Sequence, residues 1–449
     1  MSYGIAGVFS LNQVELVQQM LKKIKHRGEF GKELFQTRNA TIGIVFSNLQ
    51  SHILKTTASD YNDKLQPALI QENKLVLRRD LLGIVPLYYG KTRDHTVCFA
   101  SEVKALLDLA QDINEFLPGY IYQDNQFVQK ESYQKQPGFI QLPETIAQEL
   151  RMILCNEIQN KISENETGAW LSGGLDSSAI VSLASKYVKT MHTFAAGLKD
   201  APDIKFARIA ADYIKTRAKP DQKLHHHEII VGFKDMLKTL PDVVYSLESF
   251  DALLVRSSIT NYLAAKRASQ YVSQVFSGEA GDELFAGYEY LKTFNPLFLA
   301  DELVDIMNRL HNTALQRVDR CASAFGLTAY VPFASPEIIN YALQIPAEYK
   351  LYNGIEKWIL RRALDGFLPD AILNRTKAKF WQGAGIGELF SQYADKHISD
   401  ADFRKESVLP CAWKLHSKEE LMYYRIFKDH FGELENLDWM GRTKPTSPV

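Results

Sequence analysis

The first 130 residues alternate between short apolar runs and polar turns, which is the pattern of β-strands. Apolar runs occupy residues 5–9, 42–46, 74–77, 86–89 and 97–100, and a hairpin is expected over 120–128 with its turn at Asp124 and Asn125. Apolar side chains recur with a helical period over residues 14–24, and a second helix is expected over 101–109. Strands with few helices between them predict stacked antiparallel sheets.

The pattern changes after a polar stretch, residues 131–142, that contains Pro137 and Gly138. A helix expected over 144–161 precedes a strand at 167–171, a helix at 178–188 and a strand at 191–196, and this alternation predicts a parallel sheet flanked by helices. From about residue 295 the pattern is mainly helical. We therefore expect an α+β domain over residues 1–136, a linker over 137–142, an α/β domain with a helical C-terminal part over 143–441, and a disordered tail over 442–449.

Charge and cysteine content narrow the functional class. The 449 residues include 52 Lys and Arg against 53 Asp and Glu, so the formal net charge of −1 gives no global field for nucleic acid or an anionic membrane. The chain shows no apolar run of the roughly 18 residues that a membrane helix needs, and no signal-peptide pattern. The four cysteines are far apart, without a CxxC pair. We expect a cytoplasmic protein with reduced thiols that acts on small molecules, without nucleic-acid or membrane partners.

Residues 171–178, Leu-Ser-Gly-Gly-Leu-Asp-Ser-Ser, link a buried strand to a helix. Glycines let backbone N–H groups approach an anion, and the helix N-terminus adds positive potential. Ser172, Ser177 and Ser178 add hydroxyl donors, and Asp176 stands where a carboxylate could hold Mg²⁺ beside phosphates. The lysine of a Walker A motif is missing, so the loop predicts phosphate binding without γ-phosphoryl transfer.

This loop resembles the pyrophosphate loop of the N-type ATP pyrophosphatases. Further along, residues 277–288, Ser-Gly-Glu-Ala-Gly-Asp-Glu-Leu-Phe-Ala-Gly-Tyr, resemble a signature of asparagine synthetases. Residues 247–258, 329–333, 354–361, 375–377 and 417–427 resemble other motifs of the same family, in the same order. The resemblance implies an ATP pyrophosphatase domain, of the adenine nucleotide α-hydrolase type, in an asparagine synthetase-like ligase.

The resemblance also implies a reaction. ATP adenylates a substrate carboxylate and releases pyrophosphate, and an amine then attacks the acyl-adenylate to give an amide and AMP. ATP and Mg²⁺ are the implied cofactors, and a carboxylic acid with an amine or ammonia the implied substrates. The implied site residues fall into five groups: Asp176 and Asp282 for the metal; Lys377 and Glu279 for catalysis; Ser172, Gly173, Gly174, Ser177 and Ser178 for pyrophosphate; Leu171, Ala196, Gly197, Ser277 and Gly278 for the nucleotide; and Asp251, Arg256 and Glu279 for the substrate.

The N-terminal domain resembles the class II glutamine amidotransferases at residues 4–9, 26–28, 79–90 and 99–106, which implies an αββα sandwich of the Ntn-hydrolase type. Those enzymes use an N-terminal cysteine, but here Tyr3 precedes Gly4 and no cysteine occurs before Cys98. Ser2 is one residue out of register for that role. Apolar residues 44–46 replace an expected arginine, and the usual amide-binding string is missing. We therefore expect a degenerate domain that does not hydrolyse glutamine.

Several alternatives stay open. In lacking the glutaminase residues, the chain resembles the β-lactam synthetases, whose amine lies within the substrate. Residues 248–256, in contrast, are closer to asparagine synthetase. Leu253 and Leu254 replace two threonines of the family, and Tyr330 replaces an arginine, so the acid could be aspartate with free ammonia or another acid, with or without ring closure. An inactive paralogue that acts as a binding partner is the alternative of another class, and the protein could form a homodimer. The run of three histidines at 225–227 does not predict a metal site, because adjacent strand residues face opposite sides.

Overall fold

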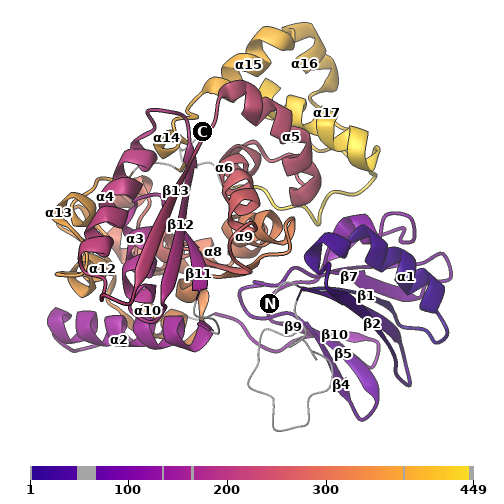
Figure 1. Ribbon diagram of the computed structural model, residues 1–449. Helices are drawn as coiled ribbons and strands as arrows, with labels where there is room; N and C mark the ends of the chain where they lie inside the picture. Colours follow the sequence, from indigo (N-terminus) through magenta and orange to yellow (C-terminus); the bar gives the residue numbers. More distant parts are fainter. Residues whose placement is uncertain (1–2, 48–66, 134–135, 163–165, 378–379, 444–449) are drawn as a thin grey trace.

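The computed structural model describes residues 3–47, 67–133, 136–162, 166–377 and 380–443 (Figure 1). Its N-terminal part contains two antiparallel sheets. The six-stranded sheet has the order β2 (Gly31–Gln36), β3 (Thr41–Phe46), β1 (Tyr3–Val8), β7 (Val97–Ala100), β6 (Tyr88–Lys91) and β8 (Asn114–Glu115). The four-stranded sheet has the order β10 (Gln126–Gln129), β9 (Tyr120–Gln123), β5 (Lys74–Arg78) and β4 (Ala68–Gln71).

The alternation of side chains along these strands builds two apolar layers. Ile5 and Ile44 of the large sheet pack with Leu75 and Leu77 of the small sheet, so the core lies between the sheets. The opposite face of the large sheet packs against helix α1 (Val14–Lys23), as Figure 1 shows. The two stacked antiparallel sheets agree with the predicted sandwich. A second outer helix layer, on the small sheet, is not seen among residues 67–133.

Most predicted strands of this part and the hairpin at 120–128 are found within about two residues of their expected bounds, but β2, β4 and the two-residue β8 were not anticipated. The prediction of a helix over 101–109 was wrong, because only a short 3-10 helix, η3 (Val103–Ala105), forms there. A distant side chain explains the difference. The Glu248 carboxylate accepts the backbone N–H groups of Val103 (2.9 Å) and Lys104 (2.7 Å), which fixes this turn from outside.

The C-terminal part contains a five-stranded sheet with the order β13 (Lys223–Ile230), β12 (Thr190–Gly197), β11 (Glu166–Trp170), β14 (Gln274–Phe276) and β15 (Thr328–Tyr330), all parallel. Short strands β16 (Leu351–Tyr352) and β17 (Ile355–Glu356) form a separate hairpin. The helices are α2 (Pro143–Lys161), α3 (Leu175–Ala184), α4 (Pro202–Thr216), α5 (Phe233–Leu247), α6 (Ala252–Ala268), α7 (Gly281–Leu284), α8 (Leu299–Met307), α9 (Ala314–Ser323), α10 (Pro336–Gln344), α11 (Ala347–Lys350), α12 (Trp358–Ala363), α13 (Asp370–Leu373), α14 (Phe380–Gly383), α15 (Leu389–His397), α16 (Asp400–Glu406) and α17 (Lys418–Phe431).

This part confirms the predicted parallel α/β sheet. Helices α2, α3 and α4 cover one face of it, and α6 and α9 cover the other (Figure 1). From β11 the chain first builds β12 and β13 on one side, and then returns to add β14 and β15 on the other. The loops that follow β11 and β14 therefore meet at the carboxyl edge of the sheet. Parallel sheets bind ligands where the strand order reverses in this way.

The chain end packs back onto the C-terminal part. Arg442, inside the predicted tail, donates to Glu420 (2.6 Å), and Thr443 donates its backbone N–H to Asp251 (3.0 Å). Residues 444–449 lie outside the described residues. Among the helices that the structure describes, none is long and apolar enough to cross a bilayer.

Candidate functional site

The loop after β11 is held by its own serines. Ser177 Oγ accepts the backbone N–H of Ser172 (3.2 Å) and donates to the Gly174 carbonyl (3.2 Å). Gly173 has a φ of +70°, and a Cβ there would lie 2.2 Å from the carbonyl carbon of Phe206 on α4. Only glycine fits at this position, because both the backbone conformation and the space exclude a side chain. The loop therefore packs closely against α4.

The loop after β14 approaches the first loop equally closely. A Cβ at Gly278 would lie 2.7 Å from the backbone nitrogen of Ser177, and a Cβ at Gly281 would lie 2.6 Å from Cγ of Asp176. These two glycines bring Asp176, in the first turn of α3, beside Asp282, in the first turn of α7. The two predicted metal carboxylates thus lie together.

Two lysines join these carboxylates. Lys357 Nζ forms an ion pair with Asp176 and lies 2.6 Å from Asp282 Oδ1, while Lys377 Nζ donates to Asp282 Oδ2. Lys357 is 2% exposed and stands at the start of α12 with a φ of +55°, in the left-handed region. We call these four residues, Asp176, Asp282, Lys357 and Lys377, the loop ion cluster.

Burial acts differently on the two carboxylates. Burial disfavours the charged form of Asp176 and so raises its pKa. The Lys357 charge lowers this pKa, but the neighbouring Asp282 charge raises it and offsets part of that effect. Burial alone would also raise the pKa of Asp282, but Lys357 and Lys377 hold it well below its usual range. Oδ1 of Asp176 is buried without a hydrogen-bond partner among the described residues. An orphaned carboxylate oxygen beside a second carboxylate is a donor set that suits a hard cation.

A cavity opens between the two loops. The predicted site residues that line it are Ser172, Gly174, Asp176, Ser177, Ser277, Gly278, Glu279, Asp282 and Lys377. Those that do not line it are Leu171, Gly173, Ser178, Ala196, Gly197, Asp251 and Arg256. The structure therefore gathers the metal, catalytic and most phosphate residues at one place, and leaves part of the nucleotide set and two substrate residues outside it.

The residues outside the cavity have other contacts. Asp251 caps α6 by accepting the Leu254 N–H (2.8 Å), and also accepts from Thr443. Arg256 forms an ion pair with Glu419 of α17. A Cβ at Gly197 would lie 3.0 Å from the carbonyl oxygen of Ala384, so residues near 384 cover this end of β12. The substrate and nucleotide roles assigned to these residues stay predictions.

Several cavity or near-cavity residues were not singled out as site residues from the sequence, among them Lys357, Arg317, Trp170 and Asn261. Lys357 lies inside a motif, residues 354–361, so a signal for it was present. Arg317 of α9 donates to Glu279 Oε1 (2.7 Å) and to Ser257 Oγ (2.8 Å), yet no motif marks it. Trp170 and Asn261 also line the cavity, and the indole N–H of Trp170 is buried without a partner among the described residues.

The histidine run lies within β13, where residues 225–227 pair in register with residues 192–194 of β12. His192 Nδ1 lies 3.0 Å from His227 Nε2, and His192 Nε2 lies 3.0 Å from Glu166 Oε1. Burial and the neighbouring imidazoles lower the pKa of His227 to about 4. Within the part of the chain that the structure describes, no three His, Cys, Asp or Glu side chains converge as metal ligands.

In the N-terminal part, Tyr3 is the first residue of β1 and pairs with Phe46 of β3. Ile44, Val45 and Phe46, which stand where an arginine was expected, are all buried. Ser2 and residues 48–66 lie outside the described residues, as does Lys379. The described part of this region therefore has buried apolar side chains where the resemblance to the amidotransferases led us to expect an arginine.

Comparison with known proteins decides the family. A family model described as asparagine synthase matches residues 158–299 and 295–444, well over half of the chain. The chain belongs to the asparagine synthase family. A second model, for a glutamine amidotransferase domain, matches residues 69–140. Both matches confirm the resemblance drawn from the sequence motifs.

Several relatives of this asparagine synthase family member are plant proteins. Asparagine synthetase [glutamine-hydrolyzing] 3 of Arabidopsis thaliana is 34% identical over 388 residues, which cover 80% of this chain and 65% of that protein. The asparagine synthetase [glutamine-hydrolyzing] of Sandersonia aurantiaca is 31% identical over 392 residues, 82% of this chain and 73% of that protein. The chain therefore spans about two thirds of the length of the curated relatives that it matches.

Solved structures resemble the family member only distantly. NMN synthetase from Francisella tularensis aligns with a TM-score of 0.30 at 14% identity, over 66% of this chain and 97% of that one. The NH₃-dependent NAD synthetase from Campylobacter jejuni aligns with a TM-score of 0.29 at 12% identity, over 65% of this chain and 98% of that one. Similarity at this level does not inform the activity of this chain.

Proposed function

We propose that this chain is an ATP-dependent ligase that adenylates a substrate carboxylate, releases pyrophosphate, and then joins the acyl group to an amine to form an amide. The loop ion cluster is the observation that carries the proposal. Two carboxylates and two lysines meet between a serine-glycine phosphate loop and a second glycine loop, at the carboxyl edge of a parallel sheet. Membership of the asparagine synthase family supports the same chemistry.

Residues of the cavity suit the phosphates of ATP in the first step, the adenylation of the carboxylate. Backbone N–H groups and hydroxyls of the loop after β11 would bind the β- and γ-phosphates. Lys377, the more exposed of the two lysines, would exchange its contact with Asp282 for the charge that develops on the phosphate oxygens. Lys357, which contacts both carboxylates, would offset their mutual repulsion and hold them in place beside the phosphates.

The donor set fits Mg²⁺, because Asp176 Oδ1 is buried and has no hydrogen-bond partner in the described part of the chain, and Asp282 is held ionised beside it. Asp176 and Asp282 would hold the ion. When bound, Mg²⁺ would neutralise charge on the pyrophosphate leaving group.

Glu279 is the proposed base for the second step. Its carboxylate lines the cavity, and Arg317 donates to it at 2.7 Å, which holds it in one orientation. From there it would accept a proton from the attacking amine as the amide forms and AMP leaves. Trp170 and Asn261 line the wall beside it with donor groups that a bound acid could satisfy.

The proposed amine is ammonia or an amine of the substrate, and not the amide of glutamine. Tyr3 at the nucleophile position and the buried apolar residues 44–46 support this. Leu254, which replaces a hydroxyl residue of the family, packs in the hydrophobic core and offers no hydrogen bond to a small polar acid. Aspartate with free ammonia therefore competes with a less polar acid within the same proposal.

A pyrophosphate-release assay tests the reaction. The full chain with ATP, Mg²⁺, a panel of carboxylic acids and ammonia or amines should release pyrophosphate and AMP in equal amounts. Asp176→Asn should remain folded and lose turnover, while Asp200→Asn, an exposed carboxylate outside the cavity, should not. ADP and phosphate as products would contradict the proposal. With glutamine as donor, glutamate release above a Ser2→Ala control would overturn the amine assignment.

A further inference from the structure

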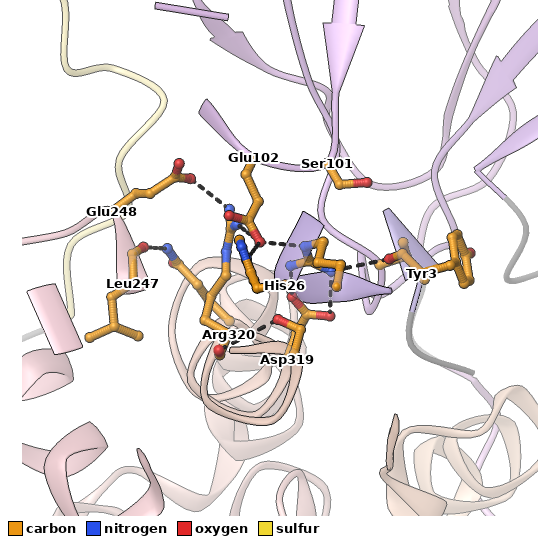
Figure 2. Close-up of polar contacts among 12 residues, drawn as sticks. Tyr3, His26, Ser101, Glu102, Leu247, Glu248, Asp319 and Arg320 are labelled. Atoms are coloured by element: carbon orange, nitrogen blue, oxygen red, sulfur yellow. Dashed lines mark hydrogen bonds and ion pairs between the residues drawn. The ribbon is translucent and has the colours of Figure 1, made fainter. Parts of the chain in front are cut away.

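The N-terminal part contributes buried charges to its contact with the C-terminal part. We call the residues that meet there the interface ion cluster: Arg27, Glu102 and Lys104 from the N-terminal part, and Glu248, Asp319 and Arg320 from the C-terminal part. Three cations face three carboxylates, so the cluster is neutral as a whole. Figure 2 shows Glu102, Glu248, Asp319 and Arg320 converging there.

Each part of the molecule supplies the counter-charges of the other. Glu102 is 0% exposed and lies 2.6 Å from Lys104 Nζ and 2.9 Å from Arg320 Nη1. Arg320 also donates to Glu248 at 2.9 Å, and Arg27 forms ion pairs with both Glu102 and Asp319. Burial alone would raise the pKa of Glu102, but His26 and the surrounding cations hold this pKa well below its usual range. The Glu102 carboxylate therefore stays ionised.

Helix α9 connects this cluster to the candidate site. Asp319 and Arg320 lie in the interface ion cluster, and Arg317, in the same helical turn, donates to Glu279 (2.7 Å) and Ser257 (2.8 Å). One residue earlier, Gln316 donates to the backbone carbonyl of Leu247 (2.9 Å). A helix rises 1.5 Å and rotates about 100° per residue, so fixing Asp319 and Arg320 also fixes the direction of Arg317.

We propose that the N-terminal part serves the synthetase site as a positioning element, by holding α9 so that Arg317 keeps Glu279 in place. The inference rests on the proposed function, in which Glu279 touches the reacting amine. Arg317 and the interface ion cluster are positioning residues. A displacement of about 1 Å at a catalytic group can cost up to a hundredfold in rate, so small shifts of α9 are enough to matter.

Asp319→Asn in the full chain is the test variant, because the Asp319 side chain is 22% exposed and its loss disturbs folding least. We expect kcat to fall about tenfold with the KM for ATP nearly unchanged. In an Arg317→Met background the same substitution should change kcat by less than about twofold, because the path to Glu279 is already cut. Asp319→Glu, which keeps the charge, should recover most of kcat. Asp124→Asn, which removes an exposed ion pair with Lys74, is the matched control.

Hydrogen exchange separates this inference from the proposed function. Asp319→Asn should speed exchange in α9 and in residues 277–284, and Asp124→Asn should not. Exchange that changes only in the N-terminal part, or equal effects of Asp319→Asn with and without Arg317, would overturn the inference. If the unaltered chain shows no ligase turnover but exchange responds as expected, the proposed function fails and the mechanical link stands.

Discussion

Lys377 is the most exposed member of the loop ion cluster, at 29% of its side chain, against 3% for Lys357. The two lysines therefore suit different tasks. Lys357 is buried between two carboxylates and acts as a fixed counter-ion, because removing it would leave two like charges facing each other. Lys377 borders the cavity and can change partners when a polyanion enters. A cation that is free to move suits a charge that exists mainly in the transition state.

Lys377→Met should lower kcat by roughly 10²–10³, which corresponds to losing about 3–4 kcal/mol of transition-state stabilisation. ATP affinity should stay near normal, because the contact is made mainly in the transition state. Steady-state kinetics and equilibrium nucleotide binding measure the two quantities. Lys205→Met, an exposed lysine of α4, is the control. Lys379→Met should also be neutral. Failure of Lys377→Met through weak ATP binding alone would refute the assignment.

At the scale of elements, the site depends on how closely two loops and one helix pack. The loop after β11 lies against α4, and the loop after β14 lies against the start of α3, each through a glycine that leaves no room for a side chain. These contacts set the distance between Asp176 and Asp282. The site is thus a product of element packing as much as of the charged residues themselves.

Gly173→Ala should both destabilise the fold and abolish ATP binding. The new methyl would face the Phe206 backbone at 2.2 Å, and the residue has a φ of +70°. Gly366→Ala is the matched control, since it has a φ of +76° but its methyl meets no described atom within 4 Å. It should cost only about 1 kcal/mol of unfolding free energy, and Gly173→Ala should cost several. Urea unfolding and nucleotide binding measure both. Similar losses in the two variants would contradict the packing account.

The sequence predicted elements where local pattern decided them. The strand, glycine loop and helix over 167–188 were found because hydrophobic period and turn residues agree there. Residues 101–109 were mistaken for a helix because Glu248, far along the chain, caps their backbone. Arg317 could not be anticipated for a similar reason. Its role follows from α9 packing on one face of the sheet, within reach of Glu279, which no local pattern encodes.

At the scale of the whole molecule, more than one group of buried charges connects the N-terminal and C-terminal parts. Besides the interface ion cluster, Glu115 of the N-terminal part lies 2.7 Å from Arg79 and 3.3 Å from His311 of the C-terminal part. Burial alone would raise the pKa of Glu115, but Arg79 and His311 lower it to about 2. The unfolded chain, with an ordinary glutamate pKa, therefore binds a proton at a pH where the folded chain does not.

Stability should consequently fall as the pH drops from about 5 toward 2. The contribution of Glu115 is fully present above the unfolded pKa near 4.5 and is lost as the pH approaches 2. Between pH 6 and pH 3.5, the free energy of unfolding of Glu115→Gln should fall by about 1 kcal/mol less than that of the unaltered protein, as measured by urea unfolding. Glu433→Gln, at an exposed ion pair, serves as control. Parallel pH curves for the unaltered protein and Glu115→Gln would refute this reading.

The composition of the cavity wall has a kinetic consequence for nucleotide capture. Five carboxylates and four basic groups line it, which leaves a formal charge of −1. Such a wall does not focus a polyanion from a distance, because each lysine and arginine is already matched by a nearby acid. Free nucleotide should therefore arrive by unassisted diffusion. Raising ionic strength should leave its association rate nearly constant, in contrast to sites whose unmatched positive charge accelerates capture at low salt.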